Sequence, residues 1–336
     1  MPDSIIDRSG AEALIPEDYF AEIQQGVTAQ SIVLAAGRRL PNMQRNQKRF
    51  PVLDVLPIAY FNNANSTPND ISFKKTSRAA WEDKFIDAEE LSVIVPVPEN
   101  VLDDSEFDIW GEIRPLIVEA FGNKIDGAVF FGQSAPNAWP ENITAGAIAA
   151  GNAVELNSIT VDGRTDLYND LLAEDGVLSL LEADGYMANG HVTDPSFRGK
   201  LRGLRDDDGQ PLFKRSLNTN QDMQASTNYE LDGAPMFFMS NGAFDPTVAR
   251  LVSGDWRQLV YSIRKDITTK VLTEAVIQDP DTKDIVYNLA QQDMIALRVV
   301  MRLGWQIPNP VNRLNPDSET RYPFSVLVPE GSLPTS

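Results

Sequence analysis

The longest regular pattern of apolar and polar positions predicts a helix that begins after Asp103-Asp104-Ser105 and ends at Gly132. Polar residues fall largely between apolar positions that recur at spacings of three and four, as on a helix with one buried face: Ile109, Ile113, Leu116, Ile117, Ala120, Phe121, Ile125, Ala128 and Val129. Pro115 lies inside the pattern, so we expect a kink or a restart there. The stripe from Ile113 to Ile125 is expected to pack on a late strand that contains Ile295, Leu297, Val299 and Met301.

Two extended runs on either side of a polar turn predict a long β-hairpin. The first run covers residues 50–61, the turn-rich tip residues 62–70, and the second run residues 71–97. Pro51 and Pro57 favour an edge position for the first run. The end of the second run alternates only partly, as in a strand covered on both faces. A two-stranded hairpin of this size is not stable alone in water, so it needs a partner surface.

Weaker patterns predict the remaining elements. Helices are expected over residues 15–36 with a stop at Gly37, over residues 165–181 with a weak point at Gly176, and over residues 195–204. Residues 133–159 are rich in Ala, Gly, Asn and Pro and are expected to be irregular. Buried strands are expected over residues 236–239, 259–263 and 294–307. We find no internal repeat.

Composition and charge limit the function classes. The chain has 336 residues, 42% of them apolar, and a net charge of −19, which permits a large core and argues against a dedicated nucleic-acid binder but not against a container for nucleic acid. It has no Cys and a single His, His191, which excludes disulfides, thiolate metal sites and multi-histidine centres. The polar, acidic start predicts no signal peptide, and no apolar run is long enough to span a membrane.

The one basic segment of this acidic chain lies early. Residues 26–53 contain no acidic residue but five cations, Arg38, Arg39, Arg45, Lys48 and Arg49. The segment is either a solvated loop or an arm that lies on the acidic body of another copy, where opposite potentials steer association.

Candidate chemical motifs are weak. Asp206-Asp207-Asp208-Gly209 lacks the alternating ligands and the later Glu of a calcium loop. The doublets Glu89-Glu90 and Asp103-Asp104 are expected by chance among 48 acidic residues, and His191 is more typical of a structural histidine than of a catalytic base. Glycine-rich phosphate loops are absent. We therefore predict no catalytic, cofactor-binding or metal-ligating residue, no cofactor and no enzyme activity.

The order of the predicted elements resembles the major capsid protein of tailed bacteriophages, with its Hong Kong 97-like α+β fold. The resemblance is based on IPE at 15–17 with QS at 30–31, VPVPENVLDDS at 95–105, IDGAVFFG at 125–132 and MIALRVVMR at 294–302. Each motif is loose alone, and together they cover residues 15 to 314.

The resemblance implies a division of the chain into four parts. Residues 1–40 would form an N-terminal arm and residues 41–92 an extended loop. Residues 93–132 and 263–336 would form a peripheral domain with a spine helix, and residues 133–262 an axial domain.

The resemblance also implies a function and partners. Copies would self-assemble into pentamers and hexamers of an icosahedral shell that encloses double-stranded DNA without reading its sequence. A separate scaffolding protein, a portal and decoration proteins would be partners, with no membrane, and assembly would take place in the host cytoplasm. Some relatives cross-link a loop lysine to an asparagine; nothing around Lys74, Lys75, Asn309 or Asn312 supports a cross-link here. The alternatives are an encapsulin-type compartment shell and an acidic hydrolase.

Overall fold

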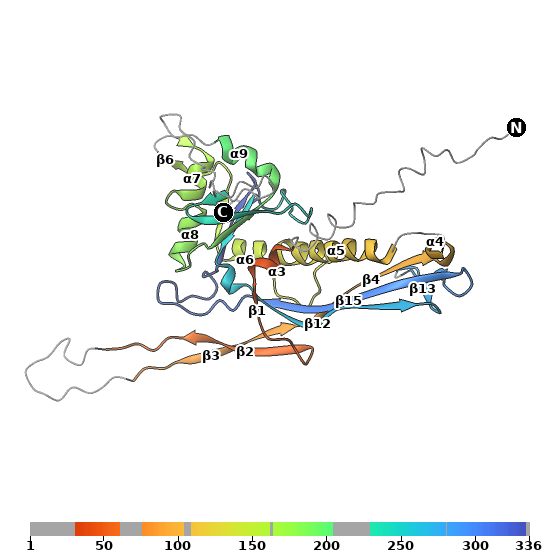
Figure 1. Cartoon of the computed structure of the whole chain (residues 1–336). Helices are drawn as coiled ribbons and strands as arrows, with labels where there is room; N and C mark the ends of the chain where they lie inside the picture. The colour runs from red at the N-terminus through yellow and green to blue at the C-terminus, as the bar shows by residue number, and fades with distance from the viewer. Residues whose placement is uncertain are drawn as a thin grey trace, which may run out of the picture.

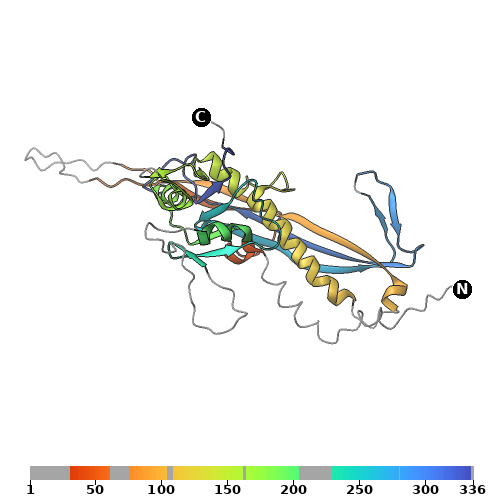
Figure 2. The same ribbon diagram turned by 90° about the horizontal axis from the view of Figure 1, so that it is seen from above.

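The computed structural model describes residues 31–60, 76–103, 109–161, 164–203, 229–279 and 281–333. The molecule is elongated: a long helix lies along a sheet of long strands, a more compact unit with a second sheet lies at one end, and a hairpin projects beyond that end (Figure 1). Seen from above, the long helix runs diagonally across the strands of the first sheet (Figure 2).

The first sheet has four strands in the order β1 (Arg38–Arg39), β12 (Val260–Leu272), β15 (Met294–Gln306) and β4 (Glu89–Pro98). Strand β15 confirms the predicted late strand and pairs along nearly its whole length with β12 on one side and β4 on the other. Alternate residues of β15 belong to the main hydrophobic cluster: Leu297, Val299, Met301, Leu303 and Trp305. The sheet therefore has one face in the core and one face turned away from it.

Helix α5 (Ile109–Phe131) covers the core face of this sheet. Ile117, Phe121 and Ile125 are in the same buried cluster as Leu297, Val299 and Met301, and Ile113 packs against the cluster, which confirms the predicted contact for these residues. The prediction is wrong for Ile295, which does not belong to this cluster among the described residues. The helix ends as predicted at Gly132, whose φ of 70° suits a glycine. Pro115 lies inside one helix and does not restart it. The expected caps Asp104 and Ser105 lie outside the described residues, after the short helix α4 (Glu99–Asp103).

The hairpin is shorter than predicted. Strand β2 (Gln47–Val55) pairs with β3 (Ala80–Asp87), and the predicted tip lies outside the described residues. The prediction that the second run continues in the hairpin to Val97 is wrong, because the chain leaves it at Ala88, which is 3% exposed, and enters the four-stranded sheet as β4. Strand β4 is also covered on one face only, since Leu91, Val93 and Val95 pack on the core while Ile94 is exposed.

The second sheet has six strands in the order β5, β16, β11, β8, β10 and β9. Their bounds are Ala153–Glu155, Phe324–Val328, Leu251–Gly254, Gly190–Thr193, Ala234–Phe238 and Tyr229–Leu231. The predicted strand over residues 236–239 is confirmed as part of β10. Strand β16, from the far end of the chain, pairs with β11 and β5. Strand β16 thus completes the second sheet, and its Phe324, Val326 and Val328 belong to the same buried cluster as the core residues of α5.

Short helices surround the second sheet (Figure 1). Helix α6 (Ile143–Ala149) lies in the stretch predicted to be irregular, and Asn142 caps it by accepting from Ala145 N at 2.8 Å. The predicted helix over residues 165–181 is two helices, α7 (Leu167–Leu172) and α8 (Val177–Ala183), and Gly176, the predicted weak point, is the N-cap of the second. The short helix over residues 195–204 is present as the 3-10 turn η2 (Pro195–Phe197) and α9 (Arg198–Gly203).

The small elements that remain complete the fold. They are the short helix α3 (Ile32–Ala36), which ends at Gly37 as predicted, the 3-10 turn η3 (Trp256–Gln258), and the two-stranded pairs β6 (Thr160–Val161) with β7 (Arg164–Thr165) and β13 (Val276–Gln278) with β14 (Ile285–Asn288). The rest of the helix expected over residues 15–36 lies outside the described residues.

Candidate assembly interface

The hairpin β2–β3 exposes apolar side chains on one face. In the register of the pair, Leu53 lies opposite Trp81, Pro51 opposite Asp83, and Arg49 opposite Phe85. Trp81 is 65% exposed and Phe85 42% exposed. An ion pair between Arg49 Nη1 and Asp83 Oδ2 at 3.1 Å crosses this face. An exposed tryptophan beside other apolar groups on a projecting hairpin is typical of an interaction surface.

The root of the hairpin is fixed to the body of the subunit. Ile86, Ala88 and Met43 form a small buried cluster with Val260 of β12, and Phe50 packs against it. Gln306 Nε2 donates to Phe85 O at 3.0 Å, and Val311 N donates to Leu53 O at 3.0 Å. The described hairpin therefore has a rigid base and an outer part whose exposed face packs on nothing within the described residues.

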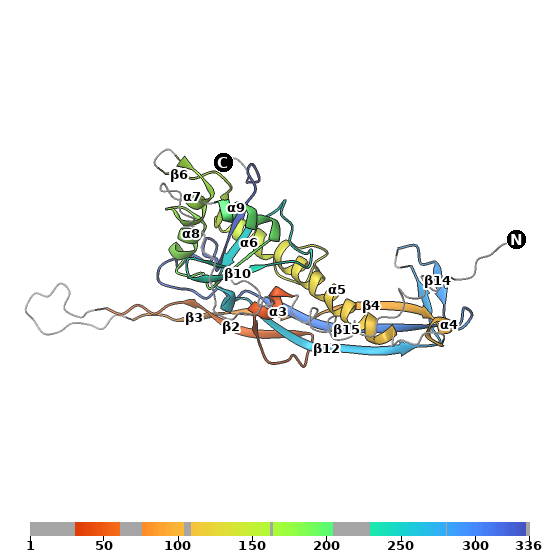
Figure 3. The ribbon, with the colours of Figure 1, turned by 45° about the horizontal axis from the view of Figure 1, so that its top comes forward.

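The pair β13–β14 exposes a second apolar surface at the opposite end of the molecule (Figure 3). Val276, Ile285 and Val286 are 49%, 62% and 46% exposed, and Val271, at the end of β12, is 53% exposed. A two-stranded pair of this kind has little stability without a covering surface. The two ends of the long axis thus each present apolar side chains on a β-hairpin.

Helix α5, the spine helix expected from the sequence, binds the start of the described chain through the buried side chain of Asp126. Its carboxylate accepts from Ser31 Oγ at 2.8 Å and from the first backbone amides of α3, Ile32 N and Val33 N, at 3.1 Å each. Asn241 Nδ2, from the unit with the six-stranded sheet, donates to it at 2.8 Å. Burial raises the pKa of Asp126 to about 6 in spite of these hydrogen bonds. One carboxylate therefore joins three parts of the chain.

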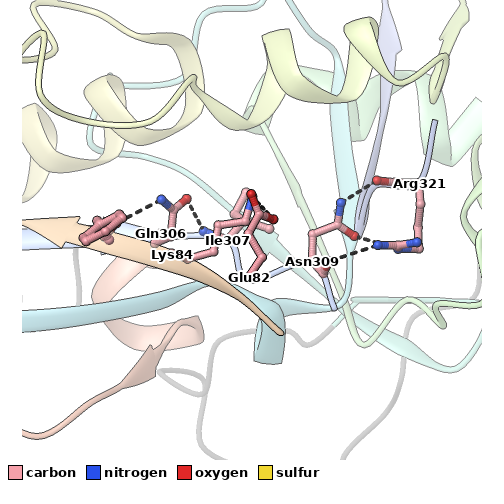
Figure 4. Close-up of polar contacts among 7 residues, drawn as sticks. Glu82, Lys84, Gln306, Ile307, Asn309 and Arg321 are labelled. Carbon is pink, nitrogen blue, oxygen red and sulfur yellow. Dashed lines mark hydrogen bonds and ion pairs between the residues drawn. The ribbon is translucent and has the colours of Figure 1, made fainter. Parts of the chain in front are cut away.

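A buried polar network joins the loop after β15 to helix α8. Arg321, 2% exposed, donates through Nε to Asn309 Oδ1 at 3.1 Å and through Nη1 to Asn315 O at 2.7 Å. Asp184 accepts from Asn152 Nδ2 at 2.6 Å and from Tyr322 N at 2.9 Å. Figure 4 shows part of this network beside the Glu82–Lys84 pair of β3.

The two asparagines considered for a cross-link belong to this network. Asn309 Nδ2 donates to Arg321 O at 2.6 Å, and Asn312 Nδ2 donates to Asp184 O at 2.6 Å. Both amides are thus used within the subunit. Lys74 and Lys75 lie outside the described residues.

The other candidate residues take structural positions. His191 is fully buried; Ser253 Oγ lies 2.8 Å from its Nδ1 and Leu231 O lies 3.1 Å from its Nε2, and burial lowers its pKa to about 4. A neutral ring that donates from Nε2 and accepts at Nδ1 satisfies both partners. Glu90 accepts from Arg302 Nε at 2.7 Å on the sheet surface. Asp104 and the Asp206–Gly209 run lie outside the described residues.

The described residues offer neither a metal-binding cluster nor a membrane-spanning helix. Among them, no group of three or more His, Cys, Asp or Glu side chains is arranged to hold a metal ion. No described helix combines the length and apolar character needed to cross a membrane. The five basic residues of the early segment lie on β1, on the loop after it and on β2, where four are exposed and Lys48 is partly buried.

An elongated α+β subunit with a spine helix, a projecting hairpin and apolar surfaces at both ends belongs to the class of shell-forming proteins. The model of the phage capsid family matches residues 11–312. The chain is 27% identical over 307 residues to the major capsid protein of Staphylococcus phage 80alpha, which covers 91% of this chain and 85% of that protein.

Solved structures agree with these sequence matches. A chain from Microbacterium phage Oxtober96 is 34% identical with a TM-score of 0.72, covering 97% of this chain and 100% of that one. A chain from Mycobacterium phage Bobi is 30% identical with a TM-score of 0.73, covering 98% of this chain and 100% of that one. The chain belongs to the phage capsid family.

Its function follows from this membership. The chain is a major capsid protein, a structural subunit of the virion shell that assembles with other copies of itself. The predicted resemblance and α+β fold are confirmed. The comparisons do not favour the encapsulin-type alternative.

Proposed function

We propose that copies of this chain form pentamers and hexamers that close an icosahedral shell around double-stranded DNA. Subunit contacts would be made by the exposed face of β2–β3 and, at the other end, by β13–β14. The observation that supports this most strongly is Trp81, 65% exposed on a hairpin whose root is anchored. Covering about 150 Å² of an aromatic side chain at about 25 cal/mol per Å² contributes about 4 kcal/mol to each contact.

The proposed role divides the chain into the four parts expected from the sequence, with two changes. The extended loop would end at Ala88, because Glu89–Pro98 pairs with β15. The axial domain would include β16, because Phe324–Val328 pairs with β11 and β5. The arm would end at α3, and the peripheral domain would comprise the spine helix with the four-stranded sheet.

The proposal includes partners and a place of assembly. A separate scaffolding protein, a portal and decoration proteins would act with this subunit in the host cytoplasm. DNA would be enclosed without base-specific contacts, since a chain with a net charge of −19 repels polyanions on average. A purely structural role without catalysis is supported by His191, the only histidine, whose ring lies buried and neutral in the second sheet.

This role is tested by comparing the shell assembly of two variants, Trp81→Ser and Glu82→Gln. The two residues are neighbours on β3 and point to opposite faces, so the second variant is a matched control. We expect electron microscopy and sedimentation to show shells for the wild-type protein and Glu82→Gln, and free subunits for Trp81→Ser. Hydrogen exchange should show that amides in the outer part of the hairpin become protected only on assembly. Equal shell yields from both variants, with the hairpin unprotected in shells, would contradict the proposed contact.

A further inference from the structure

The buried carboxylate of Asp126 accepts four hydrogen bonds with two oxygens. Its Oδ1 accepts from Ser31 Oγ and Val33 N, and its Oδ2 accepts from Ile32 N and Asn241 Nδ2. All four donors are neutral groups. Taking a carboxylate out of water has a cost that neutral hydrogen bonds offset only in part. The ionised form of Asp126 therefore depends on this closed arrangement but is not fully compensated by it.

The elements around the carboxylate carry few titratable groups. Helices α3 and α6, which both pack on α5, contain none, and the core face of β15 presents apolar side chains. A cavity of about 320 Å³ borders Ser31 and separates the site from three titratable side chains, Arg39, Tyr261 and Asp266. Lys124 of α5 faces another cavity, Asp245 accepts from Thr247 N at 2.9 Å, and Arg257 of η3 is exposed. Burial is therefore the main influence on the proton of Asp126.

Two parts of the chain are joined to α5 at this one place. Ile32 N and Val33 N belong to the first turn of α3, where backbone amides have no partner within their own helix. Asn241 is held twice, because Asn123 Nδ2, nearly one turn before Asp126, donates to Asn241 O at 2.6 Å. Separation of α3 or of the Asn241 loop from the spine helix would thus leave the carboxylate to water.

The proton affinity of Asp126 differs between the closed and the open arrangement. Burial raises its pKa from 3.8 to about 6 in the closed structure, and contact with water restores the ordinary value. A group with the higher pKa in the closed state holds its proton more tightly there, so acid favours closure and ionisation above about pH 6 favours opening. We propose that Asp126 is a proton-controlled latch that holds the start of α3 and the Asn241 loop on the spine helix when protonated and lets them separate when ionised.

Ser31 allows the latch to close in both protonation states. Its hydroxyl donates to Asp126 and accepts from Leu34 N at 3.3 Å, which leaves one lone pair of the oxygen free for a further donor. When Oδ1 takes up a proton, the new O–H donates to Ser31 Oγ, and the hydroxyl hydrogen of Ser31 turns toward the cavity that it borders. Asn241 lacks this freedom, because rotation of its amide would break the bond from Ala243 N to its Oδ1.

The latch would serve the proposed shell as an adjustable joint. A subunit that occupies both pentamers and hexamers needs a place where its parts change their relative positions. An open latch frees the start of the described chain and the loop of the six-stranded-sheet unit from the spine helix at the same time. Only this consequence rests on the proposed function, since the latch itself is a property of the free subunit.

Hydrogen exchange of free subunits tests the latch directly. After correction for intrinsic exchange rates, the opening equilibrium at the amides of Ile32 and Val33 should rise about tenfold from about pH 5 to about pH 7, which follows from the two pKa values. Amides of β15, which is paired on both sides, serve as the internal reference for global unfolding and should exchange far more slowly at either pH. Titration of the Asp126 carboxyl carbon by NMR gives its pKa independently.

Two matched substitutions separate the latch from a general charge effect. Asp126→Asn cannot ionise, so its opening equilibrium should not change with pH in this range. Glu119→Gln removes the same charge from the same helix and should keep the tenfold change. Melting temperatures check that both variants fold.

A reversible lock extends the test without changing Asp126. A Cβ at Gly122 would lie 3.4 Å from Ser31 Cβ, close to the separation of about 3.5–4.5 Å found in disulfides, and the chain has no other cysteine. The oxidised double variant Ser31→Cys with Gly122→Cys should therefore keep the Ile32 and Val33 amides protected at about pH 7. Reduction should restore their opening.

Several results would overturn the inference. Exchange of Ile32 and Val33 at the rate of the β15 amides would mean that the latch does not open by itself. A tenfold change retained in Asp126→Asn would assign the proton to another group, and a carboxyl pKa near 4 would remove the proton control. Equal exchange of the oxidised and reduced double variant would place the opening elsewhere. Failure of the wild-type protein to form shells would instead contradict the proposed function and leave these measurements on free subunits unaffected.

Discussion

Truncation of Phe121 to Ala tests the packing of the spine helix on the long strands. Phe121 is 4% exposed and shares a buried cluster with Val299 and Met301, which are nearly 180 positions later in the chain. Contact over this separation comes from the tertiary fold and not from local structure. Loss of the ring therefore reports directly on the core between α5 and β15.

The surroundings of Phe121 set the size of the effect. Removal of a buried phenylalanine side chain costs about 3–5 kcal/mol when a cavity remains. Phe121 already borders a cavity of about 320 Å³ that is also lined by Arg39 and Asp266. Water can enter a space with such polar groups, which reduces the cavity contribution, so we expect about 3 kcal/mol. At about 2–4 °C per kcal/mol for larger domains, the melting temperature should fall by about 6–12 °C.

Leu116→Ala is the matched control, since Leu116 lies on the same helix and is 58% exposed. It should change stability by no more than about 0.5 kcal/mol. Phe121→Leu keeps most of the volume and should cost less than about 1.5 kcal/mol. Melting is measured on free subunits under conditions that prevent assembly. Equal melting temperatures for Phe121→Ala and Leu116→Ala would refute a core between the spine helix and β15.

Other perturbations address other parts of the subunit. Because burial raises the pKa of Asp126 from 3.8 to about 6, the folded protein holds this proton more tightly than the unfolded chain. The unfolding free energy should therefore gain about 3 kcal/mol from this group as the pH falls from about 7 to about 3. Urea unfolding of Asp126→Asn should lack that gain, and an identical pH profile in both proteins would refute it. Ile285→Ser should lower the shell yield and leave the melting temperature unchanged. A normal shell yield would mean that β13–β14 does not contribute to the interface. Replacement by Gln of the five basic residues of the early segment should slow assembly, most strongly at low salt; these residues are Arg38, Arg39, Arg45, Lys48 and Arg49. Assembly rates that stay unchanged at every salt concentration would favour a solvated segment.

The core elements were predictable because their signals are periodic. The apolar stripe of α5 and the alternation in β15 each indicate which face is buried, and Gly132 marks where the helix ends. The end of the hairpin was not predictable in this way. Residues on both sides of Ala88 favour extended structure, and the change of partner from β2 to β15 is a property of the tertiary fold that leaves no local signal.

The elements around the second sheet show the same limit. Helix α6 is built from Ile, Thr, Ala and Gly, so it has little contrast between an apolar and a polar face. The sequence signal that could have predicted its start was Asn142, a favourable N-cap residue that follows Pro140. The assignment of β16 depends on pairing with β11, more than 70 residues earlier in the sequence. The sequence also did not predict that Asp126 connects three parts of the chain, because a carboxylate in the interior of a helix usually indicates a solvent-exposed position.

The distribution of packing in the subunit explains why its function requires other copies. Helix α5, β15 and β16 bury their apolar side chains within the chain, so the two central cores are complete in one molecule. The outer part of β2–β3 and the pair β13–β14 expose theirs at opposite ends of the long axis. Since a hairpin gains its stability from a covering surface, contact with another copy stabilises the same elements that it joins. Ordering of the hairpins and growth of the shell should therefore occur together, with the folded cores as the fixed part of each subunit.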